Sequence, residues 1–285
     1  MSGSLNSVVT NTGAMIALES LDKTNSSLSA VQKQVSTGYR VADATDDGAA
    51  YAVAQSVRST IGALTTANQQ LGSVQGLLST TASGLTDISN RMASMRDVLV
   101  NLSSSSVQGN ERTQYEDQYL SLLGNVQSFI QDANYNGKTL IGNITGSAGT
   151  FGEVSVVRNE IAATYGINTF GGSEMYASIA FTTTQMNGAS TVAALISATG
   201  TFINQMNAVG GALNLVGSST NFVNNQISYN NDKIDSLNSG LGSMVDADLA
   251  KESARLQSLQ IQQQLGTRAL TLANQAPQTL LSLFK

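Results

Sequence analysis

Residues 57–102 read VRSTIGALTTANQQLGSVQGLLSTTASGLTDISNRMASMRDVLVNL. Apolar or small residues recur here in two interleaved series, each with a step of seven. The series are Val57, Leu64, Leu71, Leu78, Leu85, Met92, Leu99 and Thr60, Ala67, Val74, Thr81, Ile88, Met95, Leu102. The alternating spacings of three and four predict one long helix that buries a narrow seam against partner helices. At about 1.5 Å per residue this helix is about 69 Å long, so other long helices must lie along it.

A second stretch, residues 192–244, continues the same alternation and predicts a second long helix. Its seam residues are Val192, Leu195, Thr199, Phe202, Met206, Val209, Leu213, Val216, Thr220, Val223, Ile227, Asn230, Ile234, Leu237, Leu241 and Met244. Shorter seams over residues 14–35 and from residue 249 onwards predict two terminal helices that pair with each other, the last of them buried on more than one side. Pro277 is expected to interrupt the last helix. The sequence therefore predicts a mainly α protein, built as a long antiparallel coiled coil or helical bundle.

Local signals predict where the helices end. Gly38 is suited to the C-terminal cap of the first helix, and Asp46 or Asp47 to the N-terminal cap of the long helix that follows from about residue 50. The serine-rich run 103–106 with the following Gly109 predicts a turn. A third helix is expected after it and ends within residues 134–137. Its buried face contains Tyr119, Leu123, Val126, Ile130 and Ala133.

The middle of the chain, residues 138–184, lacks the helical period. Short β-type runs at 154–157 and 179–183 alternate with glycines, which predicts a small β-hairpin region at the end of the bundle. Glycines 146, 149 and 152 have the wrong spacing for a phosphate-binding loop, and no Lys-Ser or Lys-Thr pair follows them. We therefore interpret these glycines as turn residues.

Composition limits the chemistry that this chain can perform. The sequence contains no histidine and no cysteine, which removes the commonest general base, the commonest metal ligands and any disulfide. The net charge of −5 argues against nucleic acid as a partner. No apolar run is long enough to span a membrane, and the N-terminus lacks the pattern of a cleaved signal peptide. Enzymatic activity, cofactors and metals are therefore not expected.

Charged residues make up only 12% of the chain, although thin helical rods expose most of their residues. Small neutral polar residues take their place, and these lose little free energy when they are covered by another protein surface. This composition favours packing against copies of the same chain, and a weakly charged monomer is the alternative.

Three motifs resemble the bacterial flagellin family. VSTGYRVADATDDGA at 35–49 is similar to the family's LSSGxRINSAxDDAAG segment, DADLAKE at 246–252 matches DADxAxE, and ANQAPQTLLSL at 273–283 resembles the terminus ANQxPQxxLxLL. The likeness covers about residues 5–140 and 190–285. The residues that match the motifs are Gly38, Arg40, Asp46, Asp47, Asp246, Asp248, Asn274 and Gln275.

The resemblance implies a short flagellin, without large outer domains, that polymerises into the secreted, extracellular flagellar filament used for motility. Residues 1–45 with 245–285 would form an inner-tube coiled coil, residues 46–137 with 185–244 a rod-shaped bundle, and residues 138–184 a short β and loop region. A hook-filament junction protein of the same superfamily is the alternative. Implied partners are other copies of the chain, an export chaperone, the flagellar export apparatus, the filament cap and the hook-junction proteins.

Self-assembly is expected to use apolar residues of the two terminal seams, whose burial against neighbours would drive polymerisation. These residues are Leu21, Leu28, Val31, Val35, Leu249, Leu256, Leu259, Leu280, Leu281 and Leu283.

Two further patterns are weighed against simpler interpretations. Asp246 and Asp248 could form part of a cation site, but without a third ligand at suitable spacing a structural helix cap is favoured. Some flagellins are reported to contain a metalloprotease, which needs the HExxH motif that a chain without histidine cannot provide.

Flagellins that activate the mammalian innate-immune receptor have an LQRxRELxxQ segment, aligned here with MASMRDVLVN at 92–101. Arg96 and Asp97 retain the pattern, whereas Ser94 and Asn101 depart from it, so we expect weak or no activation.

Overall fold

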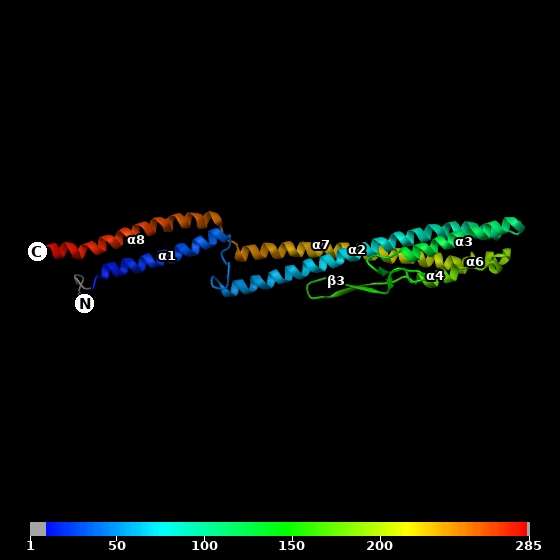
Figure 1. Cartoon of the computed structure of the whole chain (residues 1–285), viewed down its shortest axis with the longest axis horizontal. Coiled ribbons are helices and arrows are strands. Elements are labelled where there is room, and N and C mark those ends of the chain that lie inside the picture. The colour runs from blue at the N-terminus through cyan, green and yellow to red at the C-terminus, as the bar shows by residue number, and fades with distance from the viewer. Residues whose placement is uncertain (1–9, 284–285) are drawn as a thin grey trace. The chain divides into compact units, whose positions relative to one another are not determined.

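The structure, a computed structural model, describes the backbone of residues 10–283 and the side chains of residues 10–275. It is mainly helical, as predicted, with two small pairs of strands (Figure 1). The chain divides into two compact units, the terminal unit of residues 1–59 and 235–285 and the central unit of residues 60–234. The helices are α1 Thr12–Thr37, α2 Gly48–Leu102, α3 Gly109–Asp132, α4 Gly172–Ile179, α5 Thr183–Met186, α6 Ala189–Leu195, α7 Thr201–Val245 and α8 Leu249–Leu283.

The strands form one short parallel pair and one hairpin. β1 (Lys138–Thr139) pairs with β2 (Thr150–Phe151), and β3 (Val154–Val157) pairs antiparallel with β4 (Thr164–Ile167). The register of the hairpin places Val154 opposite Ile167 and Val157 opposite Thr164. Residues 154–157 thus form the strand that the sequence predicts.

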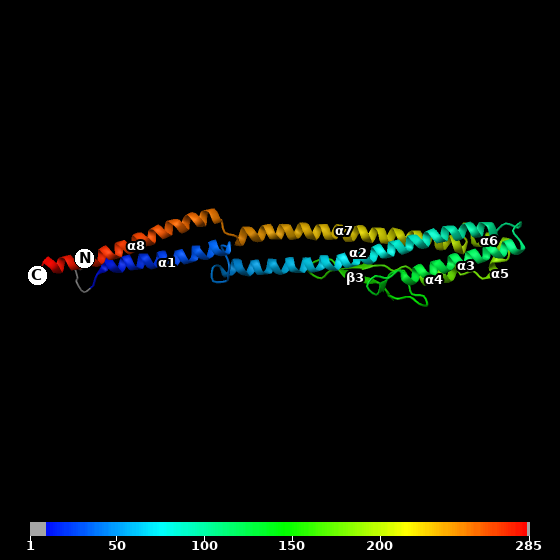
Figure 2. The same cartoon turned by 45° about the horizontal axis from the view of Figure 1, so that its top comes forward.

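In the terminal unit, α1 and α8 lie side by side in antiparallel directions (Figures 1 and 2). The Asn25 carboxamide accepts a 2.8 Å hydrogen bond from Gln263, and Asn11 donates one of 2.7 Å to the carbonyl of Ala273. A second cluster of this unit buries Val41 against residues from the start of α2 and the end of α7, namely Ala54 and Val245.

In the central unit, the heptad seam of α2 is buried from Leu64 to Leu102, as the spacing predicts. The seam residues that precede Leu64, Val57 and Thr60, are half-buried. A 55-residue helix of about 80 Å cannot bury this seam alone, and α3 and α7 supply part of the cover.

The predicted face of α3 is also buried, including Tyr119 and Ile130. The Tyr119 hydroxyl donates a 2.6 Å hydrogen bond to the carbonyl of Ile179, and its ring stacks on Phe181 at 5.9 Å. Burial raises the pKa of the Tyr119 phenol above its usual range.

Uncharged amide pairs join α2 to α7 inside the central unit. Asn68 donates to Asn231, and Gln75 donates to Asn224, each at 2.8 Å. Asn230, a seam residue of α7, is completely buried. Its amide donates to Asn68 at 2.8 Å and to the carbonyl of Arg158 at 3.0 Å, and its carbonyl accepts from Gln226 at 2.9 Å.

Four local predictions were wrong. Residues 179–183 do not form a strand: Ile179 ends α4 and Thr183 begins α5, because Thr182 caps α5 through a capping box with Gln185. Apolar β-branched runs of this length fit either structure.

The second long seam is not one continuous helix. α6 ends at Leu195, α7 begins at Thr201, and Thr199 is exposed. A Cβ on Gly200 would lie 2.1 Å from the Leu195 carbonyl oxygen, so this turn requires glycine. Val192 and Phe202 are nevertheless both buried, because periodicity reports which residues face the core and not whether the backbone between them is helical.

α8 differs from its prediction in two respects. It continues through Pro277 to Leu283, since a proline removes one backbone donor and can bend a helix without ending it. Its buried surface is also narrower than predicted, with Leu259 as the buried core residue among its described side chains. Within the described part of the chain, no helix has an apolar stretch long enough to cross a membrane.

Candidate functional site in the terminal unit

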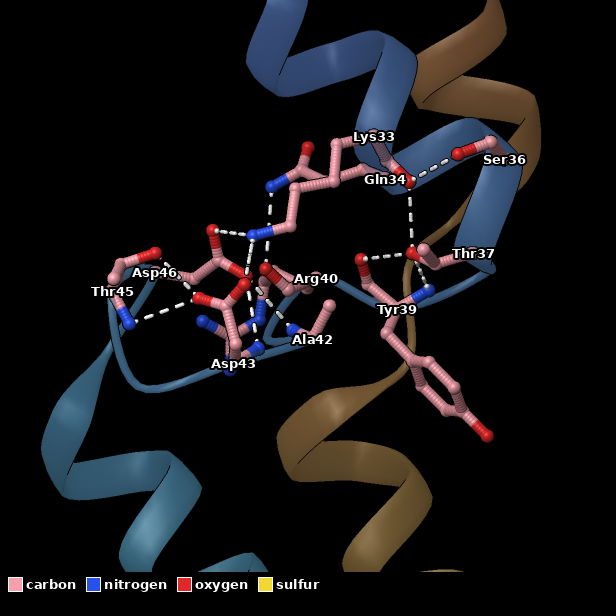
Figure 3. Close-up of polar contacts among 10 residues, drawn as sticks. All are labelled: Lys33, Gln34, Ser36, Thr37, Tyr39, Arg40, Ala42, Asp43, Thr45 and Asp46. Carbon is pink, nitrogen blue, oxygen red and sulfur yellow. Dashed lines mark hydrogen bonds and ion pairs between the residues drawn. The ribbon is translucent and has the colours of Figure 1, made fainter.

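The chain passes from α1 to α2 beside its passage from α7 to α8 (Figure 3). Gly38 ends α1 with a φ of 76°, a left-handed conformation that glycine adopts without strain, and its N–H donates to the carbonyl of Gln34 at 2.9 Å. The Gly38 carbonyl then accepts a 2.9 Å hydrogen bond from the backbone N–H of Ala247. The predicted C-cap is confirmed, and it also connects the two passages.

Backbone hydrogen bonds hold these two segments together. Tyr39 and Asp246 form an isolated antiparallel bridge. The backbone N–H groups of Arg40 and Val41 donate to the carbonyl of Val245 at 2.7 and 3.2 Å, and the Arg40 guanidinium donates to the carbonyl of Met244. The motif residues Gly38, Arg40 and Asp246 therefore lie in one junction.

Lys33 organises the loop that follows α1. Its ammonium contacts Asp43 at 2.7 Å and Asp46 at 2.8 Å. Asp46 also accepts hydrogen bonds from the backbone N–H groups of Ala42 and Asp43, at 2.9 and 3.2 Å, and Asp43 accepts one from the N–H of Thr45 at 2.9 Å (Figure 3).

These contacts shift the three ionisable groups in complementary directions. The hydrogen bond from Lys33, with those from Thr45, holds the pKa of the Asp43 carboxyl well below its usual range. The bonds from Lys33 and from the Ala42 N–H lower the pKa of Asp46. Asp43 and Asp46 in turn raise the pKa of Lys33. Sequence reasoning missed Lys33, although two aspartates three residues apart after a helix end could have indicated a nearby cation.

The remaining acidic motif residues cap helices. Asp47 accepts from the backbone N–H of Ala50 at 3.0 Å at the start of α2. Asp248 accepts from the N–H groups of Ala250 and Lys251, both at 3.1 Å, at the start of α8. Asp47, not Asp46, is the cap. Across the residues that the structure describes, His, Cys, Asp and Glu form no group of three that could bind a metal ion.

The predicted self-assembly residues fall into different environments. Leu28, Val31 and Leu259 are buried together between α1 and α8 of the same chain, with Val35 and Leu256 packed against them. Part of the predicted surface is thus already covered within one chain.

The other predicted residues are less covered. Leu21 is half-buried over Gly266, and Leu249 is 49% exposed. Leu280, Leu281 and Leu283 lie outside the described side chains. Asn274 and Gln275 of the tail motif are exposed on α8 and do not belong to the junction.

An apolar surface is exposed on these two helices. On α8, Ile261, Leu265 and Leu272 are 58%, 58% and 70% exposed, and their spacings of four and seven place them on one helix face. On α1, three further large apolar residues are exposed, namely Met15, Ile16 and Leu18. We refer to these six residues as the outer apolar surface. Met15, Ile16 and Leu18 lie outside the predicted seam of the first helix. Ile261, Leu265 and Leu272 belong to the apolar residues from which the sequence predicts a last helix buried on more than one side, and their exposure contradicts that burial.

The segment aligned with the immune-receptor motif lies on α2. Arg96, Asp97 and Asn101 are exposed, whereas Ser94 is half-buried and donates a 3.2 Å hydrogen bond to the carbonyl of Asn90.

Comparison with known proteins gives consistent matches. Two family models match, the bacterial flagellin N-terminal helical region over residues 8–145 and the C-terminal helical region over residues 196–284. The chain is 31% identical over 285 residues to Flagellin FljM of Caulobacter vibrioides, with 99% of both chains covered. It is 31% identical over 291 residues to a flagellin of Brucella melitensis biotype 1, with 98% of this chain and 99% of that one covered.

A solved structure of a flagellar hook-associated protein from Vibrio parahaemolyticus is also similar. Its TM-score is 0.59 at 17% identity, and the match covers 70% of this chain and 100% of that one. At this identity the likeness shows a shared fold.

Proposed function

The chain belongs to the bacterial flagellins, the structural subunits of the flagellar filament, and we propose that it polymerises by packing its outer apolar surface against copies of itself. The observation that supports this proposal is the exposure of six large apolar side chains on two paired helices. Among the described side chains of these helices, Leu28, Val31 and Leu259 form the buried cluster between them. Apolar residues grouped on one exposed helix face, such as Ile261, Leu265 and Leu272, are typical of a protein–protein contact surface.

The burial of this surface contributes to the free energy of association. Complete burial of a leucine or isoleucine side chain contributes about 1.5–3 kcal/mol. Ile261, Leu265 and Leu272 are each more than half exposed, so each can still contribute about 1 kcal/mol or more. Association costs about 4–15 kcal/mol in lost freedom, so several such contacts must form together. A helical polymer provides them, because each subunit contacts several neighbours.

The two sets of terminal residues then have separate roles. Leu28, Val31 and Leu259, with Val35 and Leu256, pair α1 with α8, and the outer apolar surface contacts neighbouring subunits together with Leu249. In this proposal residues 1–45 with 245–285 form the inner tube, residues 46–137 with 185–244 the rod, and residues 138–184 a small β and loop region. Leu21, Leu280, Leu281 and Leu283 are assigned to subunit contacts.

A hook-filament junction protein is the second candidate, because a hook-associated protein shares the fold. The full-length similarity to two flagellins favours the filament subunit. Copy number per flagellum separates the two functions, since a filament subunit is present in large excess over a junction protein.

We further infer that the chain is a structural protein without catalytic activity, exported through the flagellar apparatus to the cell exterior. The absence of histidine and cysteine supports the first inference, and family membership supports the second. Purified filaments are expected to show no peptidase activity. An export chaperone, the filament cap and the hook-junction proteins are the expected partners.

The experiment is a polymerisation assay after a jump in protein concentration, followed by sedimentation and negative-stain microscopy. Leu272→Asp is expected to raise the critical concentration at least about tenfold, because it removes an apolar contact and places a charge in the interface. Leu281→Asp tests the terminal tail in the same way. The control is Ser253→Asp, an exposed change in the first turns of α8, beside Glu252 and Arg255. Normal filaments from Leu272→Asp would contradict the proposal.

A further inference from the structure

The β3–β4 hairpin presents an isolated apolar side chain at its tip. Ile161 is 76% exposed, more than any other large apolar residue among the described side chains. The residues that follow it, Ala162 and Ala163, are neutral, whereas Arg158 and Glu160 before it are charged. Burial of this side chain against another protein surface would be favourable, because most of its apolar area is in water.

The hairpin tip is fixed in position. Glu160, the neighbour of Ile161, forms a 2.5 Å ion pair with Lys233 on α7. The buried Asn230 binds the carbonyl of Arg158, and Asn159 accepts a 2.9 Å hydrogen bond from the N–H of Ala163. The ion pair also neutralises the one acidic charge at the tip. An apolar side chain on an ordered turn loses little conformational entropy when it binds.

The same unit contains an apolar pocket that its own residues leave open. This pocket has a volume of about 410 Å³ and is lined by Leu140, Phe170, Ala212, Leu215 and other neutral residues of α2, α7 and the loop after β4. Gly211, which has no side chain, also lines the pocket, and the lining residue Leu215 is 56% exposed. The pocket residues are uncharged, so the pocket can accept the apolar side chain of Ile161.

The hairpin tip cannot reach the pocket of its own chain. The tip is bound beside Lys233 and the pocket is centred near Ala212, roughly twenty residues apart on α7. At about 1.5 Å per residue this separation is about 30 Å. An Ile161 side chain that enters this pocket must therefore belong to another molecule.

We propose that the hairpin tip of one subunit inserts Ile161 into the Leu140–Phe170–Leu215 pocket of a second copy of the same chain. This inference rests on the proposed self-assembly. The contact joins two different surfaces, so each subunit retains a free tip or a free pocket for the next, which produces an open-ended polymer. It also requires neighbouring subunits to be displaced along α7 by about 30 Å.

Disulfide trapping tests the contact directly, because the natural sequence contains no cysteine. Chains with Ile161→Cys are mixed with chains with Leu215→Cys, copolymerised and oxidised, and the linked peptides are identified by mass spectrometry. A disulfide requires Cα atoms within about 7 Å, so it reports close proximity. The control pairs Ile161→Cys with Tyr229→Cys, an equally exposed residue of α7 outside the pocket.

We expect a link between positions 161 and 215 in filaments, and little or none between 161 and 229. Filaments that form without the 161–215 link, or that link position 161 equally well elsewhere, would overturn this contact and leave the filament function intact. Failure of the unmodified chain to polymerise at all would instead contradict the proposed function.

A second measurement does not depend on cysteine variants. Ile161→Asp is expected to raise the critical concentration about tenfold or more, and Ile161→Val to retain native behaviour. Ser155→Asp is the matched control, since it adds the same charge at an exposed position of the same hairpin. Native polymerisation of Ile161→Asp would overturn the proposal. All three monomers should have native circular dichroism, because position 161 is exposed.

Discussion

Replacing Asn230 by alanine tests how the central unit fixes the positions of its parts. Asn230 is completely buried in the α7 seam and binds three groups, Asn68 on α2, the carbonyl of Arg158 at the hairpin and Gln226 on α7. A polar residue at such a seam position specifies helix register, because only one alignment satisfies its hydrogen bonds. The variant Asn230→Ala removes all three bonds.

The expected cost follows from those bonds. A buried donor or acceptor left without a partner costs about 1–3 kcal/mol. The Arg158 carbonyl loses its hydrogen bond from Asn230. Asn68 also loses a hydrogen bond, but it is only half-buried, so water can replace Asn230 there in part. We therefore expect Asn230→Ala to lower the free energy of opening of the central unit by about 2–4 kcal/mol. The control Asn224→Ala removes one exposed amide pair with Gln75 and should cost less than about 0.5 kcal/mol.

Native-state hydrogen exchange measures this free energy for each unit separately. Amides in the buried half of α2 report the central unit, and those of β3 and β4 report the hairpin. The hairpin amides should lose the most protection, because Asn230 contacts the hairpin directly. Equal effects of the two substitutions, or an Asn230→Ala variant as stable as the native chain, would refute this reasoning.

Three further predictions concern other parts of the chain. Lys33 lowers the pKa of the Asp46 carboxyl in the folded chain. The stabilisation from this ion pair is therefore present above the unfolded pKa of about 4, and it is lost as the pH falls through the lower pKa of the folded state. A carboxyl titration by NMR that shows no shift for Asp46 would contradict this prediction. Gly84→Ala should destabilise the central unit, because the new Cβ would lie 2.9 Å from the side chain of the buried Ile141. At Gly72 a Cβ would meet open space, so Gly72→Ala should stabilise the unit by up to about 1 kcal/mol. Thermal unfolding of the two variants measures both effects. Ser94 lies where the receptor segment of activating flagellins has an arginine, so we expect weak or no activation. A cell-reporter response within about tenfold of that of a strongly activating flagellin, at the same monomer concentration, would disprove this expectation.

Much of the fold could be predicted because helical bundles are encoded in local periodicity. The α2 seam, the buried face of α3 and the Gly38 cap all depend on residues within a few turns of each other. The same reasoning assigned residues 179–183 to a strand, although they include the end of α4 and the start of α5. It also joined α6 to α7, because a spacing pattern does not reveal the tight turn at Gly200.

Contacts between distant residues could not be predicted. Lys233 and Glu160 are separated by 73 residues, and the sequence contains no pattern that links them. Arg112 is buried in α3 and donates to the carbonyls of Val107 and Met186, although arginine ordinarily indicates a surface position. The family motifs located the junction, but the ion pairs of Lys33 within it emerged only from the three-dimensional arrangement.

The uncharged amide pairs between facing helices have a consequence for the environments in which a filament can work. Side-chain amides such as those of Asn68, Gln75 and Gln263 carry no net charge, so dissolved ions do not screen their interactions as they screen those of surface ion pairs. Helices joined in this way keep their mutual attraction in dilute and in saline water alike. The pairing of helices inside each subunit therefore depends little on the salinity around the swimming cell.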